Sequence, residues 1–141
     1  MLTKINHIGI AVHSIEEALP FYRDSLGMTL HGTEEVPSQK VKVAFLAIGE
    51  SKIELLEPTS PESPVAKFLE KNGPGVHHVA YSVPDIAGAI AQLTASGTRM
   101  IDAVPREGAH GALIAFIHPK SSGGVLTEIC QWPAAAKETI L

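Results

Sequence analysis

The chain has 141 residues, of which 45% are hydrophobic and 18% are charged. These proportions argue against a disordered chain. The length is sufficient for one domain, or for two half-size modules that share one core. The formal net charge of -4 at pH 7 argues against a general nucleic-acid or anionic-membrane binder, because both functions need a basic surface.

The first predicted element is a strand over residues 4–12, where apolar side chains alternate with small or polar ones. A helix is expected next, because Ser14 and Glu17 have the spacing of a capping box and Gly27 supplies a stop. Pro20 conflicts with an unbroken helix. We expect it to bend the helix or to shorten its first part.

Two apolar runs, at residues 41–48 and 53–56, predict a β-hairpin with the sequence GES as its connection. The proline-rich segment that follows predicts a linker over residues 59–75. Within this linker we expect a short helix that begins after Ser63 as N-cap and ends at Gly73.

The second half of the chain repeats the same order of elements. A strand at residues 76–83 leads to a helix that Asp85 opens and Gly97 closes. Three further strands are expected around residues 100–104, 113–117 and 125–130. We therefore predict one domain over residues 1–141, with a first module, a linker and a second module at 4–58, 59–75 and 76–131.

Two stretches of the sequence are copies of each other. KINHIGIAVHSI, from residue 4, and GVHHVAYSVPDI, from residue 75, align at a constant offset of 71 residues, which places His7 on His78. Each half also ends on a glutamate within an apolar strand, Glu54 in KIELLEP and Glu128 in VLTEICQ. Such a repeat indicates a duplicated structural unit that buries its open face against its copy.

Strand pleating predicts the faces on which these four residues lie. Successive side chains point to opposite faces of a strand, so each histidine shares its face with residues that have small side chains. These neighbours are Gly9, Ala11, Ala80 and Ser82. The two glutamates lie on the opposite face of their strands from the apolar residues that pack against the helix of each half. If the two sheets curve around a shared cleft, His7, Glu54, His78 and Glu128 converge at its centre.

Two imidazoles and two carboxylates are a suitable ligand set for a divalent transition metal. Taken alone, a strand histidine is more often a hydrogen-bonded core residue, and a glutamate between apolar neighbours often marks the outer face of a strand. The prediction depends on the coincidence of all four, because ligand identity and count together define a metal site.

Five motifs, INHIGIAV, FYRDSLGM, IELLEP, VHHVAYSVPDI and HPKSSGGVLTEI, resemble the vicinal-oxygen-chelate superfamily, and most closely its methylmalonyl-CoA epimerases. The resemblance implies an α+β fold in which paired βαβββ modules form a cupped, partly open sheet around a metal cleft. It also implies a homodimer and a divalent ion such as cobalt, nickel, manganese or zinc. In this family His7, His78 and Glu128 would hold the ion, and Glu54 would occupy a fourth position at which some epimerases have glutamine.

Such an enzyme interconverts (2R)- and (2S)-methylmalonyl-CoA by removing the C2 proton, through an enolate that the metal stabilises. Proton transfer on both faces of a planar intermediate needs two bases, and we expect Glu128 to be one of them. Some epimerases place the second glutamate in the strand that corresponds to VKVAFL, where this chain has Val41, Lys42 and Val43. Glu54, Lys42, a bound water and another proton route all remain open as the second base, and we favour Glu54.

The phosphates of coenzyme A require nearby cations. Lys120, in the Gly/Ser-rich turn HPKSSGG, is the expected contact, and the backbone amides of that turn are candidates as well. Lys40 and Arg106 are weaker candidates. His118 resembles a family position, but a role in forming the turn explains it equally well. We expect His77 to point to the opposite side of its strand from His78 and to be no ligand.

Two alternative functions remain. The ligand set also suits a glyoxalase-like metal-dependent lyase, although HPKSSGG stands where those enzymes have a signature closer to DPDGY. A non-catalytic small-molecule-binding protein of the same fold is the other alternative, but such a protein has no reason to keep all four ligands.

The single cysteine, Cys130, excludes an intrachain disulfide, and we expect it to be a packed thiol rather than a nucleophile. The N-terminus lacks a signal-peptide pattern, and no window approaches ~18 uninterrupted apolar residues. We therefore expect a cytoplasmic protein with neither a membrane nor a nucleic acid as its partner.

Overall fold

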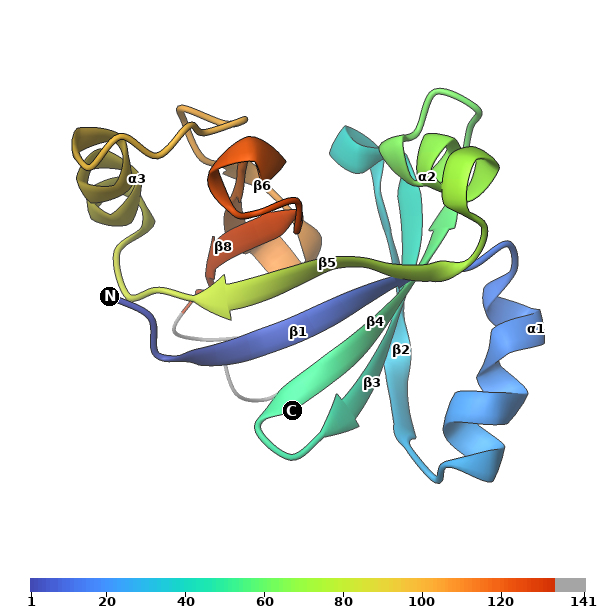
Figure 1. The fold of residues 1–141 in the computed structure, drawn as a ribbon. Coiled ribbons are helices and arrows are strands. Elements are labelled where there is room, and N and C mark those ends of the chain that lie inside the picture. Colours follow the sequence, from blue (N-terminus) through green and yellow to red (C-terminus); the bar gives the residue numbers. More distant parts are fainter. Residues whose placement is uncertain (134–141) are drawn as a thin grey trace.

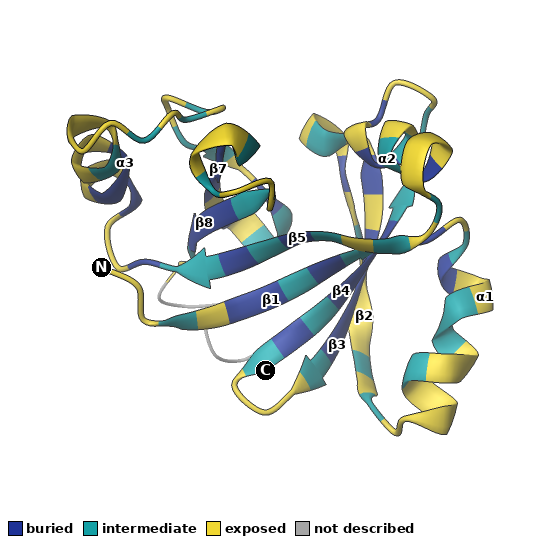
Figure 2. Ribbon diagram, viewed as in Figure 1, coloured by how far each residue is buried: buried dark blue, intermediate teal, exposed yellow. Residues whose placement is uncertain are grey.

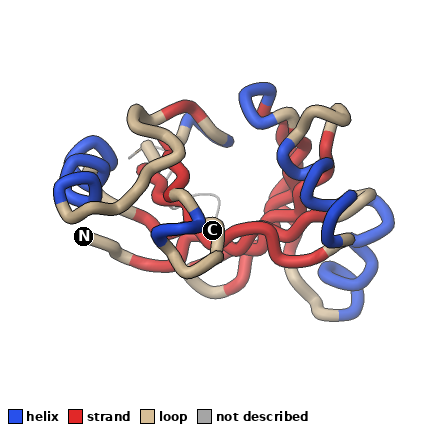
Figure 3. Tube along the Cα trace, turned by 45° about the horizontal axis from the view of Figure 1, so that its top comes forward, coloured by secondary structure: helices blue, strands red, loops and turns tan. Residues whose placement is uncertain are grey.

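Eight strands form one mixed sheet in the computed structural model, which describes residues 1–133. The strands are β1 (Lys4–Ala11), β2 (Thr29–Val36), β3 (Val41–Ile48), β4 (Ser51–Pro58), β5 (Gly75–Ser82), β6 (Arg106–Glu107), β7 (Leu113–Ile117) and β8 (Thr127–Gln131). The helices are α1 (Ile15–Leu19), α2 (Pro64–Asn72) and α3 (Ile86–Ala95), with shorter helical turns η1 (Pro20–Ser25), η2 (Pro37–Gln39), η3 (Ala109–Gly111) and η4 (Pro119–Ser121). The sheet has the order β2-β3-β4-β1-β5-β8-β7-β6 and curls into a cup (Figures 1 and 3).

Each half of the chain contributes a strand, a helix and three further strands, which confirms the expected α+β fold of paired βαβββ units. The central strands β1 and β5 pair antiparallel with each other. Each of them also has the last strand of its own half, β4 or β8, beside it in parallel. Helix α2 lies between the halves in the chain. The module boundaries themselves remain a prediction.

Helices α1 and α3 pack on the outer face of the cup, and the same device holds the start of each. The backbone amide of Ile15 donates to Glu57 Oε1 of β4 at 2.8 Å. The backbone amide of Ile86 donates to Gln131 Oε1 of β8, also at 2.8 Å. The last strand of each half therefore binds one of the free N–H groups at the start of its own helix.

Strand pleating separates an outer face, which packs against the helices, from an inner face that lines the cup. Figure 2 shows that the central strands of the sheet carry many buried residues. On the outer face, Leu55 packs with α1 and Ile129 packs with α3. Glu54 and Glu128 alternate with these residues, so both glutamates point into the cup. The inner face also carries Cys130, whose burial raises the pKa of the thiol and leaves it a packed, unreactive group.

The strand expected at residues 100–104 is wrong, because only Met100 forms an isolated bridge and the two-residue β6 comes later. The backbone amides of Ile101 and Asp102 both donate to the Phe116 carbonyl, at 2.8 and 3.3 Å. The Asp102 carboxylate accepts from the Phe116 amide at 2.9 Å. The Asp102 side chain therefore takes the place of a backbone partner for Phe116, and the backbone pairing with β7 ends there.

The conflict at Pro20 resolves as a shortened helix. Helix α1 ends at Leu19, and Pro20 begins the wider helical turn η1. Ser14 caps the helix as expected, with its Oγ atom accepting from the Glu17 amide at 3.2 Å. Strand β2 is the third strand that the βαβββ pattern requires in the first half, but the sequence did not give its position, because most of its side chains are exposed. No helix within residues 1–133 is long and apolar enough to cross a membrane.

Candidate metal centre and active site

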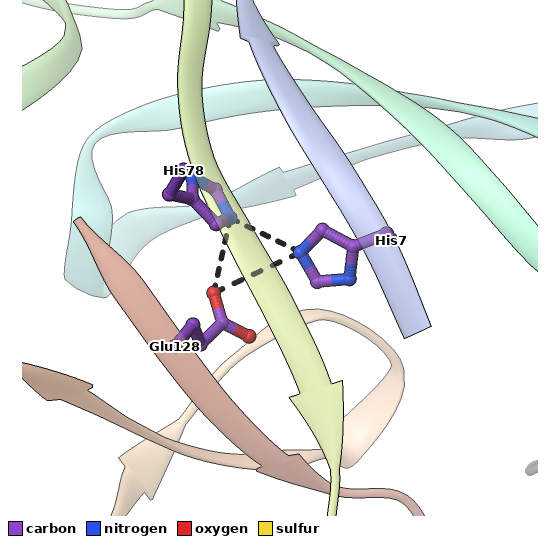
Figure 4. A group of neighbouring side chains, drawn as sticks. All are labelled: His7, His78 and Glu128. Atoms are coloured by element: carbon purple, nitrogen blue, oxygen red, sulfur yellow. Dashed lines mark hydrogen bonds and ion pairs between the residues drawn. The ribbon is translucent and has the colours of Figure 1, made fainter. Parts of the chain in front are cut away.

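Four buried polar side chains meet inside the cup. His7, Glu54, His78 and Glu128 come from β1, β4, β5 and β8, and each is at most 6% exposed. All four line one cavity. The structure thus brings together the residues that the sequence repeat singled out, and Figure 4 shows how three of them face one another.

The register between β1 and β5 explains how His78 reaches His7. Gly9 lies directly opposite His78 in the antiparallel pair. A Cβ atom on Gly9 would lie 2.3 Å from the imidazole Cε1 atom of His78, so the ring occupies the space that this glycine leaves free. The empty face predicted for the first strand is filled by the histidine of its copy.

Three ligand atoms converge at the centre of the site. His78 Nε2 lies 3.1 Å from His7 Nε2 and 3.2 Å from Glu128 Oε1. His7 Nε2 lies 3.8 Å from the same oxygen, and the three atoms all lie within 4.8 Å of one another. Burial, followed by the neighbouring His78 and Lys52, lowers the pKa of His7 well below its ordinary value. A neutral imidazole is the form that binds a metal, so this donor set fits a divalent ion.

Glu54 lies beside these three atoms rather than among them. Its Oε2 atom is 3.0 Å from Nδ1 of His7, on the opposite side of the ring from Nε2. Burial raises the pKa of Glu54 to about 7, with Lys52 acting in the opposite direction and Glu128 adding to the rise. A carboxyl group with this pKa can both accept and donate a proton near neutral pH.

Replacing Glu54 by glutamine should change how the stability of the metal-free protein depends on pH. A carboxyl pKa raised from 4.5 to about 7 means that protonated Glu54 stabilises the fold at low pH, and that this contribution is lost as the pH rises through about 7. The variant lacks this titration, so its free energy of unfolding relative to wild type should rise by on the order of a few kcal/mol across that window. Denaturant unfolding with a chelator, at about pH 4 and about pH 8, measures the change. An equal difference at both pH values would contradict the raised pKa.

Two further buried residues, Asn6 and Lys52, complete the site and were missed in the sequence. Each is 2% exposed. Lys52 Nζ donates to Asn6 Oδ1 at 2.7 Å, and the same oxygen lies 2.8 Å from His7 Nδ1. The lysine ammonium also lies over the Trp132 ring, 4.1 Å from its centroid. The signal for Lys52 was available, because a residue two places before Glu54 in a strand shares its face.

Two adjoining cavities open from this cluster. The first contains the four site residues and has mainly apolar walls; these include Val36, Val43, Leu56, Ala112, Ile114 and Trp132. The second shares Gln39, Leu56 and His78 with the first. Its own lining is mainly apolar, with Arg106 as its charged residue. A ligand with a polar end and a long apolar arm matches this pair.

The remaining residues singled out in the sequence have varied positions. Lys42 is exposed and lines neither cavity, so its position opposes a role as the second base. His77 does not point cleanly away from its neighbour, because its Nδ1 atom lies 3.0 Å from Nδ1 of His78. Lys120 is exposed in turn η4, where its backbone amide donates to His118 Nδ1 at 3.1 Å. The amides of Ser121, Ser122 and Gly124 donate to carbonyls of the turn itself, so they are not directed at an anion.

The fold and this site define a class of protein. Residues 6–116 match the model of the Glyoxalase/Bleomycin resistance protein/Dioxygenase superfamily, and the chain belongs to that superfamily. Within it, several curated relatives and structural neighbours of the chain are methylmalonyl-CoA epimerases, which confirms the resemblance found in the sequence motifs.

Three of these proteins cover nearly the whole chain. The ethylmalonyl-CoA/methylmalonyl-CoA epimerase of Cereibacter sphaeroides is 41% identical over 133 residues, which cover 93% of this chain and 99% of the relative. A Streptomyces coelicolor methylmalonyl-CoA epimerase variant, solved with 2-nitronate-propionyl-CoA, is 41% identical with a TM-score of 0.92 over 95% of this chain and 97% of its own. A methylmalonyl-CoA epimerase solved with methylmalonyl-CoA and NH4+ is 41% identical with a TM-score of 0.91 over the same shares.

Proposed function

We propose that this protein is a methylmalonyl-CoA epimerase, which interconverts the (2R) and (2S) forms of its substrate by moving the proton on C2. The observation that carries the proposal is the convergence of two imidazoles and two carboxylates in one buried cavity. Support comes from relatives named for this activity, one of them 41% identical over 93% of this chain.

The proposed metal ligands are His7, His78 and Glu128, whose nitrogen and oxygen atoms suit a divalent transition ion. Such an ion, when bound, supplies a fixed positive charge close to the thioester oxygen on which negative charge develops. Glu54 would have to turn away from His7 Nδ1 to become a fourth ligand, so we assign it to proton transfer first. Cobalt, nickel, manganese and zinc remain the candidate ions, and elemental analysis of the purified protein would identify the one bound.

Glu128 and Glu54 are the proposed acid and base. The carboxylate of one takes the C2 proton, and the electron pair of the C–H bond moves toward the thioester carbonyl. The carboxyl group of the other returns a proton to the opposite face of C2. After one turnover the two residues have exchanged protonation states, so the product state is ready for the reverse reaction. The pKa of Glu54, about 7, suits both halves of this cycle.

The second cavity is the proposed path of the pantetheine arm, because it is mainly apolar and shares His78 with the first cavity. For the phosphates we propose Lys120 together with Arg99, both exposed. The backbone amide of Arg99 donates to Ser121 Oγ at 2.8 Å, which holds the two cations on neighbouring segments. A homodimer and a cytoplasmic location remain proposals, which analytical ultracentrifugation and cell fractionation would test.

An assay that starts from one epimer tests the proposed function. Metal-loaded protein should convert (2S)-methylmalonyl-CoA to an equal mixture of epimers, read by a mutase that accepts only the (2R) form. The hemithioacetal of methylglyoxal and glutathione serves as the control substrate and should remain unchanged. Absence of epimerisation with every candidate ion would overturn the proposal, and turnover of the hemithioacetal would instead support a glyoxalase-like lyase.

A further inference from the structure

We infer that Lys52 and Asn6 are positioning residues that fix the tautomer of His7, and through it the metal affinity of the centre. The inference rests on the proposed function, because it gives these residues a role toward the proposed metal site. Neither side chain lines either of the two cavities, so neither is placed to touch the substrate. Lys52 reaches His7 through Asn6, and its ammonium also lies 4.0 Å from Glu54 Oε2.

The orientation of the Asn6 amide follows from its two other contacts. Its Nδ2 atom donates to Ser82 Oγ at 3.1 Å, and its Oδ1 atom accepts from Lys52 Nζ at 2.7 Å. Turning the amide over would place two N–H donors, from Asn6 and Lys52, against each other. Lys52 therefore selects the orientation in which Asn6 Oδ1 faces His7.

This orientation determines which nitrogen of His7 carries the hydrogen. An amide oxygen only accepts, so His7 Nδ1, at 2.8 Å from Asn6 Oδ1, must donate. In a neutral imidazole the other nitrogen then carries the lone pair. That nitrogen is Nε2, the atom that faces His78 and Glu128. The pair thus holds His7 in the tautomer that metal binding requires.

Glu54 also contacts His7 Nδ1, at 3.0 Å, but it cannot fix the tautomer of His7 throughout a catalytic cycle. Its proposed role requires it to gain and lose a proton at every turnover, and a carboxyl group that has gained a proton is a weaker acceptor. An asparagine does not titrate. Asn6 therefore keeps the imidazole oriented while Glu54 changes its protonation state.

Nitrogen-15 NMR of metal-free protein with labelled histidine tests this inference without any assay of activity. Long-range 1H–15N correlations at about pH 8 should show His7 protonated at Nδ1, with the signal assigned by its loss in His7→Gln. In a Glu54→Leu background, where no ionised carboxylate faces His7 Nδ1, Asn6→Leu should mix the two tautomers and weaken metal binding by about 10- to 100-fold, the usual effect of losing such a partner. Asn6→Asp, which keeps an acceptor, should retain both properties. Lys52→Met should resemble Asn6→Leu, whereas the exposed Lys71→Met should resemble wild type.

Glu54→Leu separates the two possible partners of His7. We expect His7 to keep its Nδ1–H tautomer in this variant, because Asn6 remains. A wild-type spectrum with the hydrogen on Nε2 would overturn the inference, and this measurement needs no variant beyond the His7→Gln protein used for assignment. The inference would also be overturned if Asn6→Leu kept the wild-type tautomer and metal affinity while Glu54→Leu lost both. An Nδ1–H signal in a protein that does not epimerise its substrate would refute the proposed function and leave the positioning role intact.

Discussion

Replacing Glu128 by glutamine is expected to abolish proton exchange at C2 of methylmalonyl-CoA while the fold is retained. The amide keeps an oxygen for the metal and nearly the same volume, but it cannot take a proton. Loss of a positioned acid or base costs about 10²- to 10⁴-fold in rate. Exchange into the substrate in heavy water, followed by mass spectrometry, measures the loss.

Glu70→Gln is the matched control, because it removes a carboxylate from the exposed surface of α2. Thermal unfolding and metal content should be recorded for both variants. Wild-type exchange in Glu128→Gln would remove the main catalytic assignment. An inactive variant that has also lost its metal would be uninformative about proton transfer, so exchange is compared only between samples with equal metal content.

Substituting alanine for Gly9 is expected to impair the site without changing any ligand. The added Cβ would lie 2.3 Å from Cε1 and 2.6 Å from Nδ1 of His78, so the imidazole has to leave its present position beside Gly9. A displacement of about 1 Å in a catalytic group costs on the order of 10²-fold in rate. Metal affinity should fall with it, because His7 and His78 no longer face the same point. Isothermal titration with the metal and the exchange assay measure both effects.

Gly75→Ala provides the comparison, since Gly75 lies in β5 and a Cβ there meets nothing within 4 Å. This variant should bind metal and exchange protons as wild type does. If Gly9→Ala also retained full metal affinity and rate, His78 would have room to move without loss, and its assignment as a ligand would be wrong. A metal stoichiometry that survives the combined loss of His7 and His78 would contradict the shared site itself.

The sequence was sufficient to predict the faces of the four central residues, because strand pleating has a period of two residues and depends only on local structure. The duplicated motif placed His7 on His78, and the apolar neighbours of Glu54 and Glu128 directed both glutamates away from the helices. The cup then brought the four together. These inferences needed no knowledge of which strands pair.

Other features depend on pairing and could not be read from the chain. Asn6 would lie on the opposite face from His7 in a regular strand, but the register of β1 with β5 shifts between Ile5 and His7, and the Asn6 side chain is buried against His7. Likewise, the Asp102 carboxylate ends a ladder only because it meets the Phe116 amide across the sheet. Lys52 differs from these features, because the strand pleat already places it on the face of Glu54, and only its burial is unusual for a lysine.

Deuterium exchange at C2 of methylmalonyl-CoA, compared between metal-loaded and chelator-stripped protein, tests the central claim most directly. We predict fast exchange that disappears on stripping and returns when a divalent ion is restored. This result would require both a base beside C2 and a bound metal, for which His7, His78 and Glu128 are the proposed ligands. Exchange that continues unchanged after complete removal of the metal, or no exchange with any candidate ion, would contradict the account.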